Sequence, residues 1–228
     1  NLLAMPVVDE EHKLVGVITV DDVIDVIKDE ATEDIYRLAG VAGDEHVFTP
    51  PREALRKRLP WLAINLGTAV LAASVVSLFQ DTIKEVVALA VFMPVVAGMG
   101  GNAATQTLTV TVRGIALGEL TWGNSRKALV KEVLVGLGNG LILGFVAAGV
   151  AWVMEGDPVL GLILGLAMVL NMVVAATAGT LIPIVLRALK VDPALASSVF
   201  ITTLTDVFGF LVFLGLGAAF LDYLRVAV

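Results

Sequence analysis

The stretch Val199–Leu221, VFITTLTDVFGFLVFLGLGAAFL, is apolar along almost all of its length and contains one ionisable side chain, Asp206. A helix needs about 20 predominantly apolar residues to cross the hydrocarbon core of a bilayer. Four further stretches are apolar and long enough to do the same, namely Trp61–Phe79, Val86–Val112, Val133–Met154 and Val159–Leu186. The sequence therefore predicts an all-α membrane protein with five transmembrane helices, which occupy residues 61–228.

The composition suits a chain whose surroundings are largely lipid. Of its 228 residues, 57% are hydrophobic and 16% are charged, whereas a soluble domain is about half apolar and a quarter charged. The absence of cysteine excludes disulfides, thiolate metal sites and cysteine nucleophiles. The net charge of −7 arises largely before the first apolar stretch. Since the sequence has no basic cluster of the kind that binds nucleic acid, we expect no nucleic-acid partner.

Lys and Arg are distributed unevenly between the two sides of the predicted spans. Cytoplasmic loops of membrane proteins carry an excess of these residues. One side carries only Lys84 and Arg225, whereas the other carries Arg52, Arg56, Lys57, Arg58, Arg113, Arg126, Lys127, Lys131, Arg187 and Lys190. We therefore predict a multi-pass protein of the cytoplasmic membrane, with a cytoplasmic N-terminus and an extracellular or periplasmic C-terminus.

The residues before the first span form two further segments. Residues 1–38 indicate a strand, a polar turn, a second strand at Leu14–Val20 and a helix, and Asp21–Asp34 is strongly acidic. These carboxylates are either a solvated helix face or a surface that senses cations, because clustered carboxylates repel one another unless a counter-ion joins them. Residues 39–60 form a linker and a short basic amphipathic helix, which we expect to end at Pro60.

Asp206 is the most informative residue, because a charge near the bilayer centre is costly and usually serves function. No predicted span supplies a Lys, Arg or His to pair with it. It must therefore meet a cation, or stay protonated and bond to neighbouring hydroxyls. Helical spacing places Thr202, Asp206 and Gly209 on one face, with Thr203 and Thr205 beside it.

This set of oxygen ligands favours Mg²⁺ or Ca²⁺ over softer metals. One carboxylate per chain suits Mg²⁺, which keeps several of its waters. An odd number of spans leaves no complete inverted repeat within one chain. We therefore expect a homodimer with two copies of Asp206 around its axis.

The second span contains an unusual run, PVVAGMGGNAATQ at Pro94–Gln106. We expect Pro94 and the glycines to weaken or open the helix, so that freed carbonyls join further neutral oxygens from Asn102, Thr105 and Gln106. The alternative is close helix packing through small residues. The same small-residue pattern recurs at Gly136, Gly140 and Gly144 and at Gly161 and Gly165, and Asn171 could bond across helices.

Three motifs resemble known sequences. Leu14–Ile27, LVGVITVDDVIDVI, resembles the end of a CBS domain, which makes residues 1–38 the C-terminal part of such a module and implies a longer parent chain. Pro94–Gln106, together with Asp192–Phe210, DPALASSVFITTLTDVFGF, is similar to the MgtE family of Mg²⁺ channels and transporters.

The resemblance implies a homodimeric pore lined by the second and fifth spans, with a Mg²⁺ site at Asp206. It also implies that the helix around Pro51–Leu59 acts as a plug, and that the acidic CBS surface binds regulatory Mg²⁺. In an intact CBS pair, the positions of Thr19 and Asp22 would contact the ribose of an adenine nucleotide.

The function that these observations favour is transport of Mg²⁺ or a related divalent cation across the membrane. A proton-coupled divalent-cation carrier, in which Asp206 exchanges protons, is the alternative. An intramembrane aspartate protease needs two catalytic carboxylates, and the predicted spans contain one, so we expect no enzyme. A scaffolding role would leave Asp206 unexplained.

Overall fold

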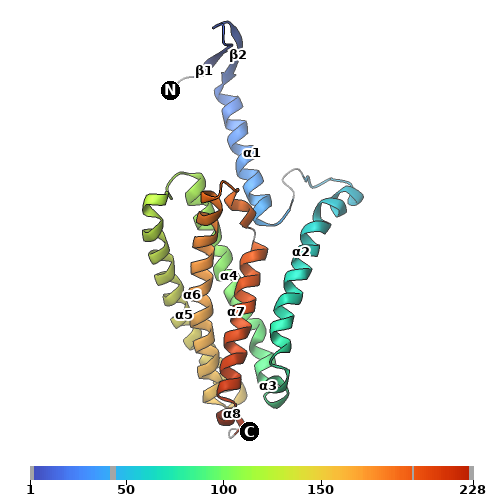
Figure 1. The fold of residues 1–228 in the computed structure, drawn as a ribbon, viewed down its shortest axis with the longest axis vertical. Coiled ribbons are helices and arrows are strands. Elements are labelled where there is room, and N and C mark those ends of the chain that lie inside the picture. Colours follow the sequence, from blue (N-terminus) through green and yellow to red (C-terminus); the bar gives the residue numbers. More distant parts are fainter. Residues whose placement is uncertain (1–2, 42–44, 197, 226–228) are drawn as a thin grey trace.

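The computed structural model describes residues 3–41, 45–196 and 198–225, so Ser197 of the second membrane motif lies outside the described residues. Among these residues, five helices are long and apolar enough to cross a membrane. They are α2 (Pro51–Ser77), α4 (Ala88–Ala116), α5 (Ser125–Glu155), α6 (Pro158–Ala188) and α7 (Ser198–Ala219). The prediction of a five-span helical membrane protein is confirmed (Figure 1).

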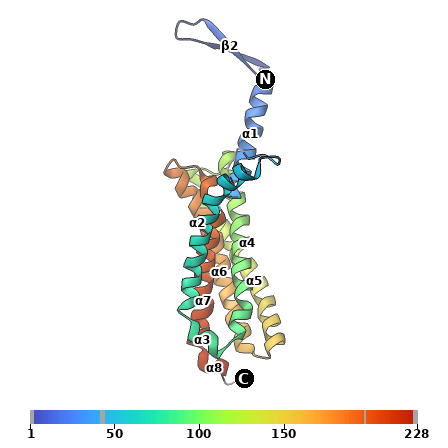
Figure 2. The same ribbon diagram turned by 90° about the vertical axis from the view of Figure 1, so that its right-hand side faces the viewer.

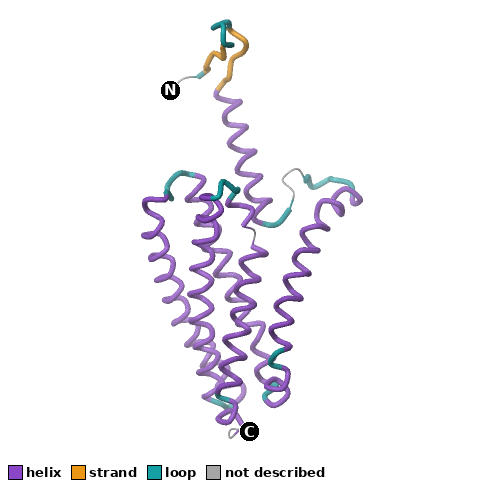
Figure 3. The backbone as a smooth tube through the Cα atoms, viewed as in Figure 1, coloured by secondary structure: helices purple, strands orange, loops and turns teal. Residues whose placement is uncertain are grey.

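Short elements connect the long helices. The helices α3 (Gln80–Glu85) and α8 (Leu221–Arg225) lie at one end of the bundle, and the single turns η1 (Trp122–Asn124) and η2 (Pro193–Ala196) lie at the other. The loop before η1 and the turn of η2 are both at the end from which the N-terminal segment projects (Figure 3). We call this end of the bundle the α1 end.

The N-terminal segment is a hairpin followed by a helix. The strands β1 (Ala4–Val8) and β2 (Leu14–Thr19) pair antiparallel, and α1 runs from Val20 to Leu38. The Thr19 hydroxyl and backbone N–H donate to Asp22 Oδ2 at 2.6 and 2.8 Å, which caps the start of α1. These two hydrogen bonds lower the pKa of Asp22 below its usual value. The hairpin projects well beyond the bundle in both views (Figures 1 and 2).

The base of α1 is attached to the turn that precedes α7. Arg37 forms ion pairs with Glu33 of its own helix and with Asp192, while Asp192 Oδ1 accepts a hydrogen bond from Ala194 N at 2.8 Å. Leu38 packs against a buried cluster that includes Ala194 and residues of α4 and α7. The N-terminal segment therefore connects directly to the start of the helix that carries Asp206.

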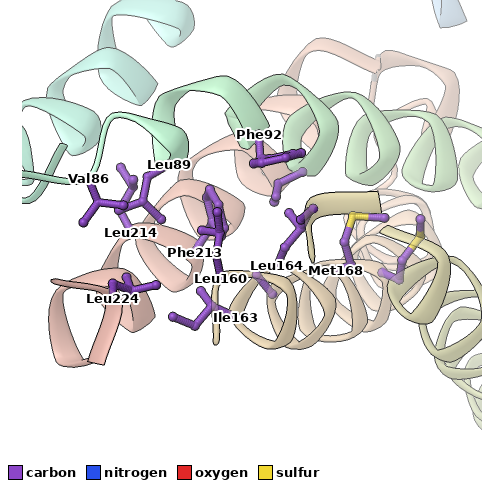
Figure 4. Packing of buried hydrophobic residues seen from close by; sticks show 14 residues of the cluster. Val86, Leu89, Phe92, Leu160, Ile163, Leu164, Met168, Phe213, Leu214 and Leu224 are labelled. Atoms are coloured by element: carbon purple, nitrogen blue, oxygen red, sulfur yellow. The ribbon is translucent and has the colours of Figure 1, made fainter. Parts of the chain in front are cut away.

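The bundle is organised around α6, which packs against α4, α5 and α7. A core of large apolar side chains fills the space between α4, α6 and α7, with Phe92, Leu164, Met168 and Phe213 at its centre (Figure 4). α5 approaches α6 closely because both present small residues. A Cβ on Gly144 would lie 2.8 Å from the carbonyl oxygen of Gly165, so the predicted small-residue interface is confirmed.

The helix α2 stands apart from the other spans and packs chiefly against α7 (Figure 1). The expectation that Pro60 ends a separate basic helix is wrong, because α2 continues through Pro60 from the basic segment into the first span. Pro60 removes one backbone N–H, and the carbonyl of Arg56 that it frees lies in the polar first turns of α2. The basic segment and the first span therefore form a single element.

Candidate functional site

Asp206 lies on α7 and is half-buried. No hydrogen bond or ion pair joins its carboxylate to any other residue in the described part of the chain. Two neighbouring hydroxyls donate to backbone carbonyls instead, from Thr203 to Val199 O at 2.6 Å and from Thr205 to Thr202 O at 2.9 Å. The alternative in which neighbouring hydroxyls hold Asp206 is therefore not the arrangement found here.

The residues predicted beside Asp206 divide between two faces of α7. Thr205 and Gly209 are buried on the face that packs into the bundle, together with Ile201. Thr202 and Thr203 are half-buried, like Asp206. The Thr202 hydroxyl donates a hydrogen bond to Val199 O at 3.2 Å. The structure thus groups Asp206 with Thr202 and Thr203, and turns Thr205 and Gly209 toward the core.

The second span is not opened at its glycines. α4 is one continuous helix from Ala88 to Ala116, with Pro94 inside it. Two of the glycines accommodate neighbouring helices: a Cβ on Gly101 would lie 3.3 Å from Thr202 Cγ2, and a Cβ on Gly100 would meet Asn171. The prediction of freed backbone carbonyls is wrong, because close packing keeps the helical hydrogen bonds intact where lipid offers no substitute.

The polar residues of α4 also divide between two sides. Asn102 and Thr105 are exposed and adjoin the side on which Gly101 meets Thr202 of α7. The Thr105 hydroxyl donates to Gly101 O at 2.9 Å, so its lone pairs face away from the helix. Gln106 instead lines a cavity of about 200 Å³ between α4 and α5. Thus Asn102 and Thr105 adjoin the Asp206 side of α7, and Gln106 lies elsewhere.

Within the described residues, no group of three or more His, Asp or Glu side chains could hold a metal ion together. The Asp206 face consists of one carboxylate, hydroxyl groups and an amide. Such a face attracts a hard cation, and a cation that keeps its water shell can be held by few direct ligands. The face is open at the surface of the single chain.

Asn171 of α6 occupies the centre of the bundle and is 1% exposed. Its Nδ2 donates to the carbonyl of Val96 on α4 at 3.0 Å, and its Oδ1 has no partner among the described residues. Cβ atoms on Gly100 of α4 and Gly209 of α7 would lie 2.9 Å from Asn171 Cγ and 2.7 Å from Asn171 Nδ2. The two glycines therefore form a slot for Asn171, which joins α4, α6 and α7 beside the Asp206 face.

Glu132 is a second buried acidic residue that the sequence analysis missed. It is 7% exposed, accepts a hydrogen bond from Thr107 Oγ1 at 3.4 Å, and forms an ion pair with Lys131. We placed the start of the third span at Val133, which assigned Glu132 to the preceding loop. The spacing of four residues between Glu132 and Gly136 could have predicted its burial, because that spacing places Glu132 on the packed face of α5.

Comparisons with known proteins agree with this architecture. The fold and site define a multi-pass membrane protein with a lone carboxylate on an oxygen-rich helix face. A family model described as MgtE, divalent cation transporter, matches residues 93–216, and a CBS domain model matches residues 1–29. The chain therefore belongs to the MgtE family of divalent cation transporters.

Curated relatives extend the likeness over nearly the whole chain. The Magnesium transporter MgtE of Bacillus subtilis is 39% identical over 224 residues, which cover 98% of this chain and 50% of the relative. Those of Enterococcus faecalis and Thermus thermophilus are 40% and 39% identical, over 98% and 97% of this chain and 49% and 50% of theirs. The chain thus spans about half the length of the curated relatives it matches.

The Asn171 slot makes a prediction about stability. Gly100→Ala should lower the free energy of unfolding by about 1–3 kcal/mol, because its Cβ overlaps the buried amide. Gly98→Ala is the matched control, since a Cβ there meets nothing within 4 Å. In an Asn171→Ala background, the cost of Gly100→Ala should shrink. Unfolding of the purified chain in detergent measures all three, and equal costs for Gly98→Ala and Gly100→Ala would contradict the slot.

Proposed function

We propose that this chain is the membrane-spanning part of a Mg²⁺ transporter, and that the ion passes along the face formed by α4 and α7. The observation that carries the proposal is Asp206, a carboxylate within an apolar span that no described residue neutralises. An ionised side chain at this depth is costly unless an opposite charge accompanies it. A permeating cation supplies that charge.

Three features support Mg²⁺ as the cation. The side chains around Asp206 offer oxygen atoms as metal ligands and no thiol, thioether or imidazole, which are the ligands that select transition metals. The hydroxyls of Thr203 and Thr105 donate to backbone carbonyls, so their lone pairs remain available to the waters of a hydrated ion. The curated relatives are named magnesium transporters.

The complete pathway requires a second copy of the chain. One chain supplies one carboxylate on an open face, and a two-fold axis beside that face would pair it with its symmetry mate. The isolated position of α2 supports the same arrangement, because Ala72 is the one residue of this helix that is buried in the single chain. We infer a homodimer whose axis passes between the α4 and α7 faces.

The α1 end is assigned to the cytoplasm, because the loops at this end carry most of the Lys and Arg. In this orientation the basic start of α2 is a cytoplasmic plug, and α1 couples the CBS segment to α7 through Arg37 and Asp192. Binding of regulatory Mg²⁺ to the acidic face of α1, or of an adenine nucleotide to an intact CBS pair, would act on the pore through this connection.

Removal of the charge at Asp206 tests the ion site. Asp206→Asn should weaken Mg²⁺ binding by at least about tenfold, because a charge-assisted contact contributes about 1.5–3 kcal/mol. Its unfolding midpoint should stay the same or rise, because an uncompensated charge disappears from the membrane. Isothermal titration and Mg²⁺ flux into proteoliposomes provide the measurements.

Asp81→Asn is the control for this experiment, since Asp81 is exposed and pairs with Lys84 at 2.8 Å. It should leave binding and flux unchanged. Unaltered flux in Asp206→Asn would refute the site. Wild-type flux that stops when the proton gradient is collapsed would favour the proton-coupled carrier over a channel.

The dimer predicts proximity between two copies of α7. Cysteine at Thr202 should be cross-linked between chains by a short bifunctional thiol reagent, because the native chain has no cysteine to interfere. Cysteine at Phe145, which is 82% exposed on the outer side of α5, should not. Denaturing gels read the result, and efficient flux by a species of monomeric mass would rule the dimer out.

The orientation predicts which thiols an impermeant reagent can reach. Cysteine at Glu155, the exposed last residue of α5, should be labelled from outside intact cells. Cysteine at Gly123, in the turn before α5, should be labelled only after the cells are opened. The reverse pattern would invert the assignment.

A further inference from the structure

A groove runs between α4 and α5 at the α1 end, on the side of α6 away from α7. Two cavities of about 320 and 200 Å³ form it, and both are lined by Val110, Lys131 and Glu132. The groove exists because α4 and α5 each pack on α6 and scarcely touch one another. Figure 1 shows α5 at the outer edge of the bundle, where lipid would surround it.

The polar part of the groove is built around the buried carboxylate of Glu132. This carboxylate forms an ion pair with Lys131, whose side chain nevertheless remains 62% exposed. Lys127 lies one helical turn earlier on the same side of α5 and lines the larger of the two cavities. Glu132 therefore positions one of the two lysines, four residues apart on α5, that line this cavity.

The same two lysines border a shallow, open hollow of about 520 Å³ on the outer surface of α5. Its other lining residues are Gly123, Arg126, Val130 and Leu134. The hollow thus combines three basic residues with two apolar ones, and Leu134 is the residue furthest from the α1 end. Below it, α5 exposes a continuous apolar surface that includes Leu141, Ile142 and Phe145.

This arrangement matches the two parts of a phospholipid. A phosphate group is attracted by adjacent ammonium groups at the membrane boundary, and an acyl chain is accommodated by an exposed apolar helix face. Trp122, which is 73% exposed in η1, directly precedes Gly123 in the sequence, and exposed tryptophans are typical of the bilayer interface. A soluble phosphate would use the lysines and leave the apolar part of the hollow without a role.

We propose that Lys127 and Lys131 bind the phosphate of a membrane phospholipid whose acyl chain lies against Val130 and Leu134 of α5. Glu132 is a positioning residue that holds Lys131 at the rim. The site is separate from the Asp206 face and does not depend on the transported ion. Because it borders the loop between α4 and α5, the lipid fixes the end of α4 relative to the bilayer.

Native mass spectrometry of the detergent-purified chain tests the proposal with phosphatidylglycerol as the probe. Wild type should retain the lipid, and Lys127→Gln should weaken retention about five-fold, as expected for one lysine near an anionic lipid. Lys127 forms no ion pair with a described residue, so this variant should keep the wild-type unfolding midpoint. Lys131→Gln is the second variant. It disrupts the local structure more, because it leaves the buried carboxylate of Glu132 without its ion pair.

The matched control is Arg56→Gln, which removes a basic residue of α2 at the same end of the bundle without touching the cavity. It should leave retention unchanged, and an equal loss in Arg56→Gln and Lys127→Gln would overturn the proposal. Retention of diacylglycerol, which lacks phosphate, as strongly as phosphatidylglycerol would also overturn it. So would displacement of the lipid by inorganic phosphate at equal concentration, since the apolar contacts would then contribute nothing.

Discussion

The insertion of Asn171 between two glycines is the contact on which the geometry of the membrane domain depends. In lipid, apolar side chains gain nothing by turning inward, so helices associate through close packing and interhelical hydrogen bonds. Asn171 provides both, because its amide reaches the Val96 carbonyl and fills space that side chains at positions 100 and 209 would occupy. Asn171 thus ties α4, α6 and α7 together at one level of the bundle.

That height determines what lies beside Asp206. Gly209 is one turn beyond Asp206 on α7, and Gly101 is the neighbour of Gly100 on α4. Once Asn171 holds Gly100 and Gly209, Gly101 meets Thr202, and the polar sides of α4 and α7 adjoin each other. The carboxylate of Asp206, which no described residue neutralises, therefore lies on an open face and is not enclosed by the bundle. An ion path shared between two chains would require such an open face.

At the α1 end of the bundle, acidic side chains position basic ones in two places. The buried carboxylate of Glu132 pairs with Lys131, and the half-buried carboxylates of Asp192 and Glu33 pair with Arg37. Each pair fixes a boundary element, the start of α5 in one case and the junction between α1 and α7 in the other. These ion pairs therefore link the membrane helices to the segments outside them.

Local properties of the chain were readable from the sequence alone. Hydropathy over about 20 residues defines a span whatever surrounds it, so the five helices and the isolation of Asp206 were predicted correctly. The four-residue spacing of Gly136, Gly140 and Gly144 likewise predicted a packed face, because that spacing is a property of one helix.

The tertiary structure decided whatever depends on a neighbouring helix. Gly100 could open a helix or admit a neighbour, and the choice depends on Asn171, far away in the sequence. Gly209 was expected beside Asp206 but faces the core, and Glu132 was assigned to a loop but is buried. Pro60 continues a helix that it was expected to end. The physical reason is that the orientation of a helix about its own axis is set by contacts between residues distant in sequence, which hydropathy and spacing within one span do not contain.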